Sequence, residues 1–152
     1  MWQPMTLSDL DSVNSIASTI WGADFYESPE VFEQKFKCYP QGCWMYNTDA
    51  YIFSHPAVLD SPPGLNELLP KFTPDCYHLH DIALLPRVRG SGIATRIVKQ
   101  LIKNNPYPCM TLVAVDGTEK YWESFGFTVR SQTAYGQYLW ISNRCRQLLQ
   151  PW

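Results

Sequence analysis

The sequence predicts an α/β (α+β) fold, a sheet with helices packed on it, and two observations favour this class. Candidate strands and helices are mixed along the chain, with a strand–helix–strand unit near the middle. The helix of that unit, over residues 91–103, carries apolar residues at three- and four-residue spacing, as expected for a helix with one face against a sheet. With 152 residues and no linker, repeat or low-complexity tract, the chain is expected to be a single domain over residues 1–152.

A short strand, two helices and a hairpin are expected in the first half of the chain. Each helix begins at a capping residue, Ser8 or Asp9 in the first and Ser28 in the second, where proline follows at the first helical position. The second helix has a partial apolar stripe made by Val31, Phe32, Lys35 and Phe36. The expected elements are a strand over 2–6, a helix to about 20, a helix from 28–29 to before 40, and paired strands over 43–47 and 50–54.

The second half is punctuated by prolines and glycines that set the element boundaries. Pro86 ends a long strand, Pro106 follows the clearest helix, and Gly126 is suited to end a short helix. The expected elements are a turn or short helix over 65–69, a strand over 76–85, a helix over 91–103, a strand over 110–115, a helix over 118–125 and closing strands over 127–130 and 135–141.

Composition excludes several classes of function. Lys and Arg total 12 against 14 Asp and Glu, so a net charge of -2 argues against a nucleic acid as the main ligand. Five cysteines, an odd number without a CxxC pair, argue against a disulfide scaffold and a zinc site, so no metal is expected. Reduced thiols, together with the lack of a signal-peptide pattern and of any long apolar run, predict a cytoplasmic protein that does not bind a membrane.

Residues 87–92, Arg-Val-Arg-Gly-Ser-Gly, lie between the long strand and the clearest helix. Glycines in such a turn let a ligand approach the backbone, and the helix behind it presents unpaired N–H groups and the positive end of its dipole. A pyrophosphate suits this site, with Arg87 and Arg89 adding positive charge at its rim. The turn lacks the GK[ST] ending of a P-loop and the third glycine of the dinucleotide-binding pattern.

The turn resembles the signature of the GNAT acetyltransferase superfamily, [QR]-x-x-G-x-[GA], with Arg87, Gly90 and Gly92 at its fixed positions. Two flanking segments are also similar to family motifs, Ala83–Pro86 before the turn and Tyr121–Phe127 beyond the next strand. The close resemblance covers about residues 76–127. It implies a mixed sheet of six to seven strands, splayed at the centre, with about four helices on both faces. It also implies transfer of an acetyl group from acetyl-CoA to a primary amine, by direct attack in a ternary complex.

The resemblance assigns the cofactor to the long strand and the turn. It implies that the pantetheine arm of acetyl-CoA pairs with the strand backbone and that the pyrophosphate binds the turn and first helical residues. Backbone amides carry this binding, so side-chain identity matters little beyond the glycines. The residues expected to bind the cofactor are Ile82, Ala83, Leu84, Arg87, Val88, Arg89, Gly90, Ser91, Gly92, Ile93 and Ala94.

Two histidines on the long strand are the candidates for the catalytic base. His78 and His80 are two apart, so they share a strand face, and Asp81 is expected on the opposite face in a structural role. By the resemblance, His80 matches a glutamate that lies in the acceptor site of family members acetylating small amines, so His80 is the first choice and His78 the second. A purely structural, hydrogen-bonded role for either histidine stays an alternative.

The general acid departs from the family pattern. The tyrosine that protonates the leaving thiolate in the family aligns with Trp122, whose indole is not a practical proton donor. Tyr121, its neighbour, is the catalytic candidate, with another tyrosine or solvent as alternatives. Trp122 also leaves open a different class of function, a CoA-binding regulatory module with little or no turnover.

The acceptor site is implied by the resemblance to lie between the first two helices, their connection and the C-terminal strands. The connection interleaves aromatic rings and carboxylates, which suits a small amine with an apolar part, although a hydrophobic clasp with solvated acids fits the same residues. An amine on a small molecule or amino acid is the first choice of acceptor, and a protein N-terminus or lysine the second; monomer and homodimer both stay open. The acceptor-binding candidates are Trp21, Asp24, Phe25, Tyr26 and Glu27.

Overall fold

The computed structural model describes residues 1–23, 27–67 and 73–142. It forms two compact units: unit 1 comprises Met1–His55, Pro63–Phe72 and His80–Ala94, and unit 2 comprises Pro56–Pro62, Thr73–Leu79 and Thr95–Trp152. The expectation that the whole chain works as one domain stays a prediction.

The strands form one mixed sheet in the order β1-β2-β3-β4-β5-β7-β6. The printed register is parallel for β4 with β5 and antiparallel for β1 with β2, β2 with β3, β5 with β7 and β6 with β7. This sheet, with four α-helices among the described residues, confirms the predicted fold class. The strands are β1 Trp2–Pro4, β2 Cys43–Tyr46, β3 Ala50–Ala57, β4 Cys76–Leu84, β5 Cys109–Ala114, β6 Thr128–Thr133 and β7 Gly136–Ser142; the helices are α1 Leu10–Ile20, α2 Pro29–Cys38, α3 Ile93–Asn104 and α4 Glu119–Glu123.

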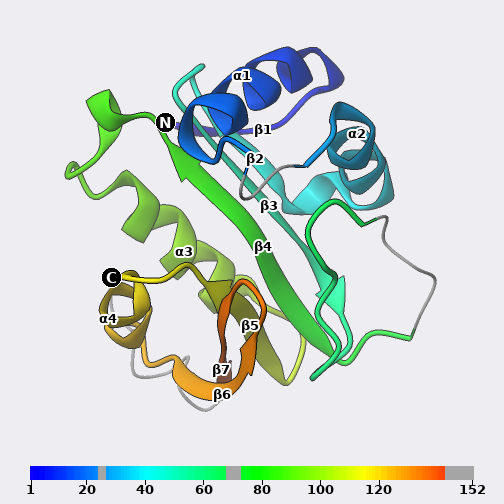
Figure 1. Cartoon of the computed structure of the whole chain (residues 1–152), viewed down its shortest axis with the longest axis vertical. Coiled ribbons are helices and arrows are strands. Elements are labelled where there is room, and N and C mark those ends of the chain that lie inside the picture. Colours follow the sequence, from blue (N-terminus) through cyan, green and yellow to red (C-terminus); the bar gives the residue numbers. More distant parts are fainter. Residues whose placement is uncertain (24–26, 68–72, 143–152) are drawn as a thin grey trace. The chain divides into compact units, whose positions relative to one another are not determined.

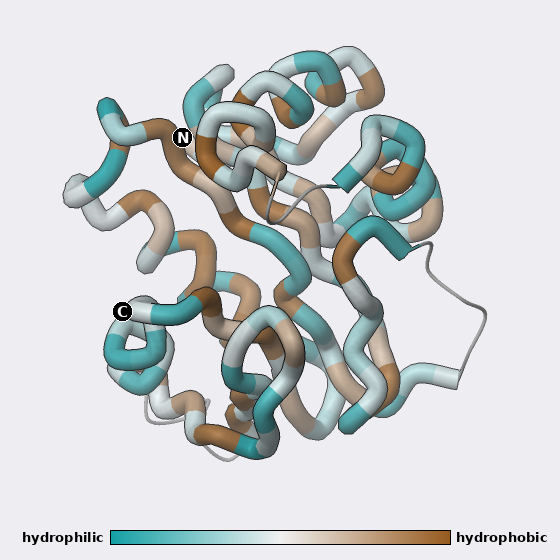
Figure 2. The backbone as a smooth tube through the Cα atoms, in the orientation of Figure 1, coloured by the Kyte–Doolittle hydropathy of each residue, from teal (hydrophilic) through white to brown (hydrophobic). Residues whose placement is uncertain are grey.

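In unit 1, α1 and α2 contact each other and pack on the strands β1 to β3 (Figure 1). Ser28 caps α2 as predicted, because its hydroxyl accepts a hydrogen bond from the N–H of Val31 at 3.3 Å. Apolar and polar stretches alternate along both helices in Figure 2, as expected where one side of each faces a core. That core joins residues of α1, α2 and the strands: Met5, Val13, Ile16, Phe32, Cys43, Met45, Tyr51, Phe53 and Ala83.

In unit 2, β7 lies between β5 and β6, so the last strand of the described residues is inserted into the sheet. Gly136 begins β7 where its backbone closely approaches β5, since a Cβ there would lie 2.0 Å from the carbonyl oxygen of Ala114. The helix expected to start at residue 91 begins at Ile93, because Gly90 and Gly92 adopt positive φ and belong to the turn.

The long strand β4 spans both units. Its register with β5 runs from Tyr77 opposite Met110 to Leu79 opposite Leu112, whereas β4 itself continues to Leu84. The end of β4 therefore belongs to unit 1, where it carries the turn and the candidate histidine His80.

Candidate functional site

Three ionisable side chains meet inside unit 1. Nζ of Lys35, on α2, lies 3.0 Å from Oε2 and 3.3 Å from Oε1 of Glu27, and 2.7 Å from Nε2 of His80 on β4. His80 Nε2 also contacts Glu27 Oε1 directly. The side chains of Lys35, Glu27 and His80 are 1%, 2% and 4% exposed. We call these three residues the buried triad.

Burial and charge act against each other in the buried triad. Desolvation works to raise the pKa of Glu27, but the hydrogen bond and charge of His80 and the charge of Lys35 outweigh it, so the Glu27 pKa is lowered. Desolvation lowers the pKa of Lys35, with Glu27 opposing it. Desolvation also lowers the pKa of His80, assisted by the positive charge of Lys35 and opposed by Glu27. An ionised carboxylate beside a neutral imidazole is the arrangement these directions favour.

A second polar chain runs beside the triad. The indole Nε1 of Trp21 donates to the hydroxyl of Tyr51 at 3.2 Å, and that hydroxyl donates to Oδ2 of Asp81 at 2.6 Å. Burial raises the pKa of Asp81 to about 7, against the hydrogen bond from Tyr51 that works to lower it.

The expectation that Asp81 faces away from His80 is wrong. The ring centroid of His80 lies 5.9 Å from that of His55 on β3, and Asp81 accepts a hydrogen bond from Tyr51 on the same strand. Because Tyr51 and His55 are four residues apart, their side chains lie on the same face of β3. Two neighbouring residues of β4 thus approach the face covered by α1 and α2. The alternation of β4 is therefore interrupted between them.

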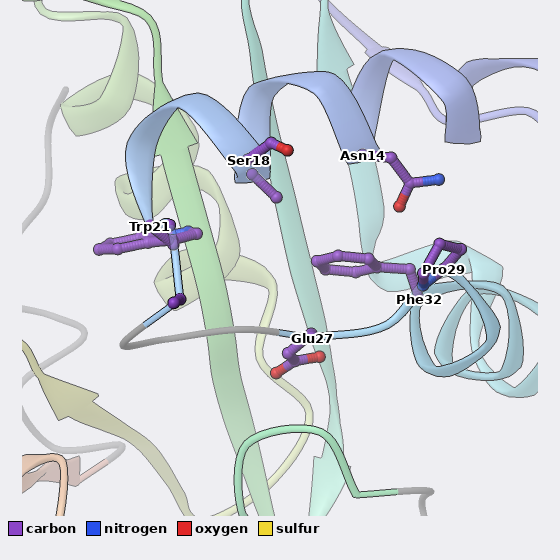
Figure 3. A pocket seen from close by; sticks show the side chains of 9 residues that line it. Asn14, Ser18, Trp21, Glu27, Pro29 and Phe32 are labelled. Atoms are coloured by element: carbon purple, nitrogen blue, oxygen red, sulfur yellow. The ribbon is translucent and has the colours of Figure 1, made fainter.

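A pocket of about 310 Å³ opens between the end of α1 and the start of α2 (Figure 3). Trp21 and Phe32 contribute aromatic walls, while Asn14 and Ser18 come from α1. Glu27 is the one member of the buried triad that appears in the described lining of this pocket. Its described lining is Asn14, Ala17, Ser18, Trp21, Gly22, Ala23, Glu27, Pro29 and Phe32.

The glycine turn has the geometry of an anion cradle. Gly90 and Gly92 have φ of 79° and 81°, and a Cβ added to either would meet nothing within 4 Å, so the space above the backbone is open. Within the described part of the chain, the N–H groups of residues 90–93 have no protein acceptor. Backbone amides at a helix start that lack protein partners are suited to bind a pyrophosphate.

The two arginines of the turn already have protein partners. Nε of Arg87 donates to Oδ1 of Asp49 at 2.8 Å in an ion pair, and Nε of Arg89 donates to the carbonyl oxygen of Leu84 at 3.0 Å. In these positions the side chains connect the glycine turn to the turn of the β2–β3 hairpin and to the end of β4. Their expected role at the rim of a phosphate site stays a prediction.

The other catalytic candidates lie in unit 2. His78 is buried, and its Nδ1 lies 2.8 Å from Oγ1 of Thr111 on β5. Tyr121 on α4 is 37% exposed, and its hydroxyl lies 3.1 Å from Oγ1 of Thr95. Partial burial raises the pKa of Tyr121, so its hydroxyl keeps its proton at neutral pH. Trp122 beside it is buried against Phe125 and Phe127.

The comparison with protein families decides the assignment, because residues 13–127 match the model of the acetyltransferase (GNAT) family. The chain belongs to the GNAT acetyltransferase family. As a GNAT protein it is an acyltransferase, and the resemblance read from the turn is confirmed. No curated protein matches the chain.

Solved structures share the GNAT fold at low sequence identity. The loading GNATL domain of CurA from Lyngbya majuscula is 13% identical with a TM-score of 0.78, over 95% of this chain and 98% of that one. Naa20 from Chaetomium thermophilum, in complex with a bisubstrate analogue, is 14% identical with a TM-score of 0.71, over 99% and 90%. The GphF GNAT-like decarboxylase, in complex with isobutyryl-CoA, is 15% identical with a TM-score of 0.64, over 84% and 72%.

Of the five predicted acceptor residues, Trp21 and Glu27 line the pocket, whereas Asp24, Phe25 and Tyr26 lie outside the described residues. Sequence reasoning missed Lys35 and Tyr51 as polar partners of the site. For Lys35 a signal existed, since a lysine stood in the apolar stripe of the second helix. For Tyr51 there was none.

No group of three or more His, Cys, Asp or Glu side chains within 1–23, 27–67 and 73–142 is arranged to hold a metal ion. In the same residues, no helix has the length and apolar character needed to cross a bilayer.

Proposed function

We propose that this GNAT protein transfers an acetyl group from acetyl-CoA to a primary amine of a small molecule or amino acid, by direct attack in a ternary complex. One observation carries the proposal: unit 1 alone holds the glycine turn with its unpaired amides, the buried triad and the pocket beside Glu27. A diphosphate site and an amine site are the two requirements of such a reaction.

The glycine turn supports acyl-CoA as the co-substrate. Pyrophosphate oxygens would accept from the backbone N–H groups of residues 90–93, and the pantetheine arm would run along Ile82–Leu84 at the end of β4. Similar folds support the same donor, since the GphF decarboxylase is described in complex with isobutyryl-CoA and the NatC complex bound to Gag peptide and CoA.

The pocket supports a compact amine as acceptor. Its volume of about 310 Å³ is at the small end of ligand sites, and it combines the rings of Trp21 and Phe32 with the carboxylate of Glu27. An ammonium group would bind Glu27 while its apolar part packs on the rings. A peptide N-terminus is the second candidate, favoured by a similar fold, the NatC complex, which is described as bound to Gag peptide and CoA.

The buried triad supplies the proton acceptor. Glu27, on the pocket wall, takes a proton from the bound ammonium and passes it to Nε2 of His80. The neutral amine then attacks the thioester carbonyl and a C–N bond forms. As the C–S bond breaks to release CoA thiolate, the amine nitrogen loses its second proton to water, which leaves the neutral amide and returns a proton to the group that protonates the thiolate. Tyr121 is the proposed donor of the proton to that thiolate.

A CoA-binding module without turnover is the rival from a different class. The observation behind it is Trp122, which occupies the family's tyrosine position and is buried in an aromatic cluster with Phe125 and Phe127. Under both candidate functions we propose that the protein is a single domain and lies in the cytoplasm. Free thiols support a reducing compartment; among the described residues they are Cys38, Cys43, Cys76 and Cys109.

The deciding experiment measures binding and turnover separately. Calorimetry tests acetyl-CoA affinity, and release of CoA thiol is followed with three acceptor sets: small aromatic amines, amino acids, and peptides with a free N-terminus. Saturable thiol release with a small amine supports the proposal. Release with peptides alone moves the acceptor to the second candidate, binding without release supports the rival, and absence of binding contradicts the acyl-CoA assignment.

A further inference from the structure

Lys35 is a buried lysine on a helix whose other charges face solvent. Lys37 and Glu33 form an exposed pair on α2, with side chains 61% and 45% exposed, whereas the Lys35 side chain is 1% exposed. Its neighbours Val31 and Phe32 are buried apolar residues. A helix that needed only to pack against the sheet would be served by an apolar side chain at position 35, because burying an ammonium is costly unless it is paired.

The surroundings of Lys35 match an ammonium group closely. Its N–H groups reach both oxygens of Glu27, at 3.0 and 3.3 Å, and Nζ also lies 2.7 Å from Nε2 of His80. The Lys35 ammonium thus contacts both the Glu27 carboxylate, which lines the pocket, and the His80 imidazole, which lies behind Glu27. Contact with both makes Lys35 more than a counter-ion of Glu27.

We propose that Lys35 is a positioning residue for acyl transfer: its ammonium keeps Glu27 ionised and His80 unprotonated, so that the pair is ready to take the proton of an amine in the pocket. This inference rests on the proposed function, because the proposed function assigns His80 as the final acceptor of the amine proton. A cation in contact with an imidazole opposes a second positive charge there, and the same cation stabilises the carboxylate. Burial is the first cause of the lowered pKa of His80, and the charge of Lys35 adds to it; His80 and Lys35 both lower the pKa of Glu27.

The other groups around His80 do not replace this cation. The ring of His55 on β3 lies 5.9 Å away and is itself titratable. Asp81, bonded to Tyr51, and Glu67 in the loop before β4 add acidic groups, and the charges of both act on Lys35. Among these described neighbours, Lys35 is the fixed positive charge that opposes protonation of His80. Without it, the hydrogen bond and charge of Glu27 would favour the imidazolium, against the effect of burial.

The test is Lys35→Met, a variant of similar length without charge, with Lys37→Met as the exposed control on the same helix. We expect the acid limb of the kcat/KM profile to move to higher pH by about one unit or more in Lys35→Met, because a like charge in contact shifts a pKa by that order. The profile of Lys37→Met should match that of the unmodified protein. A folded Lys35→Met protein with an unchanged acid limb overturns the proposal.

A second readout does not depend on turnover. The chain has three histidines, so NMR titration of labelled imidazoles, assigned with His55→Asn and His78→Asn, follows His80 directly. The midpoint of His80 should rise in Lys35→Met. If that variant fails to fold, the comparison is Glu27→Gln against Glu27→Gln/Lys35→Met, where the midpoint should be higher in the double variant. Equal midpoints overturn the role of Lys35 even if an amine is acetylated, whereas a shifted midpoint without turnover on any amine contradicts only the proposed function.

Discussion

The hydroxyl of the buried Tyr51 donates a hydrogen bond of 2.6 Å to Oδ2 of Asp81. Burial raises the pKa of Asp81 from its usual 3.8 to about 7, and burial together with the Asp81 carboxylate raises that of Tyr51 well above 10. The Tyr51–Asp81 pair is therefore neutral at mildly acidic pH and carries a buried negative charge in weakly alkaline solution.

We expect Asp81→Asn to stabilise the fold more at pH 8 than at pH 5. The folded protein holds the Asp81 proton up to about pH 7, whereas the unfolded chain loses it near 4, so the free energy of unfolding falls as pH rises through this window. Asparagine keeps an oxygen acceptor for Tyr51 and never ionises. Thermal unfolding at both pH values measures the difference.

The control for this prediction is Asp116→Asn, at an exposed aspartate that precedes α4. Its melting temperature relative to the unmodified protein should be the same at pH 5 and pH 8. If Asp81→Asn behaves like this control, Asp81 is ionised in the folded protein across the whole range, and the burial argument is wrong.

Local signals in the sequence were enough for the elements and for the turn. The Ser28 cap with Pro29 marked the start of α2, and the apolar spacing of residues 93–102 marked α3, because both depend on neighbours within a few residues. The glycine turn was readable for the same reason. Its positive φ values displaced the start of α3 to Ile93, a shift that the apolar pattern alone did not reveal.

Long-range features were less accessible. Placing β7 between β5 and β6 requires pairing that no local pattern encodes. The orientation of Asp81 depends on an interruption in β4, which strict two-residue alternation cannot predict. Lys35 was visible as a lysine in an apolar stripe, but its partners Glu27 and His80 are 8 and 45 residues away along the chain.

We expect Gly92→Val and Gly90→Val to abolish acetyl-CoA binding while the protein stays folded. Positive φ is strained for any residue with a Cβ and most for a β-branched one, so the turn would relax and redirect its amides. A valine side chain would also occupy the open space above the turn. Calorimetry should show affinity reduced at least about tenfold, equivalent to about 1.4 kcal/mol.

Gly117→Val is the matched control, because Gly117 has φ of 91° and open space around it but lies between β5 and α4. It carries the same kind of strain, so its melting temperature should fall by a similar amount. Its acetyl-CoA affinity should not change. Unchanged affinity in the Gly90 and Gly92 variants would place the pyrophosphate elsewhere.

Filling the pocket should weaken binding of the amine without changing the affinity for acetyl-CoA. Ser18 is exposed on α1 and lines the pocket, so Ser18→Trp would occupy much of its 310 Å³. We expect the KM for the amine to rise at least about tenfold, equivalent to about 1.4 kcal/mol, while acetyl-CoA affinity stays the same. Ser15→Trp, at an exposed position of α1 that does not line the described pocket, is the control. Equal amine KM values in the two variants would move the acceptor site away from this pocket.

Tyr121→Phe tests the donor of the final proton. The hydroxyl of Tyr121 lies 3.1 Å from Oγ1 of Thr95, and its raised pKa keeps it protonated in neutral solution. Loss of a general acid costs about 10²-fold or more, so kcat should fall by that order with acetyl-CoA affinity unchanged. Tyr135→Phe removes a hydroxyl from another exposed tyrosine, at the β6–β7 turn, and should leave kcat as it is. If both variants turn over normally, Tyr121 is not the acid, and the thiolate takes its proton from another tyrosine or from water.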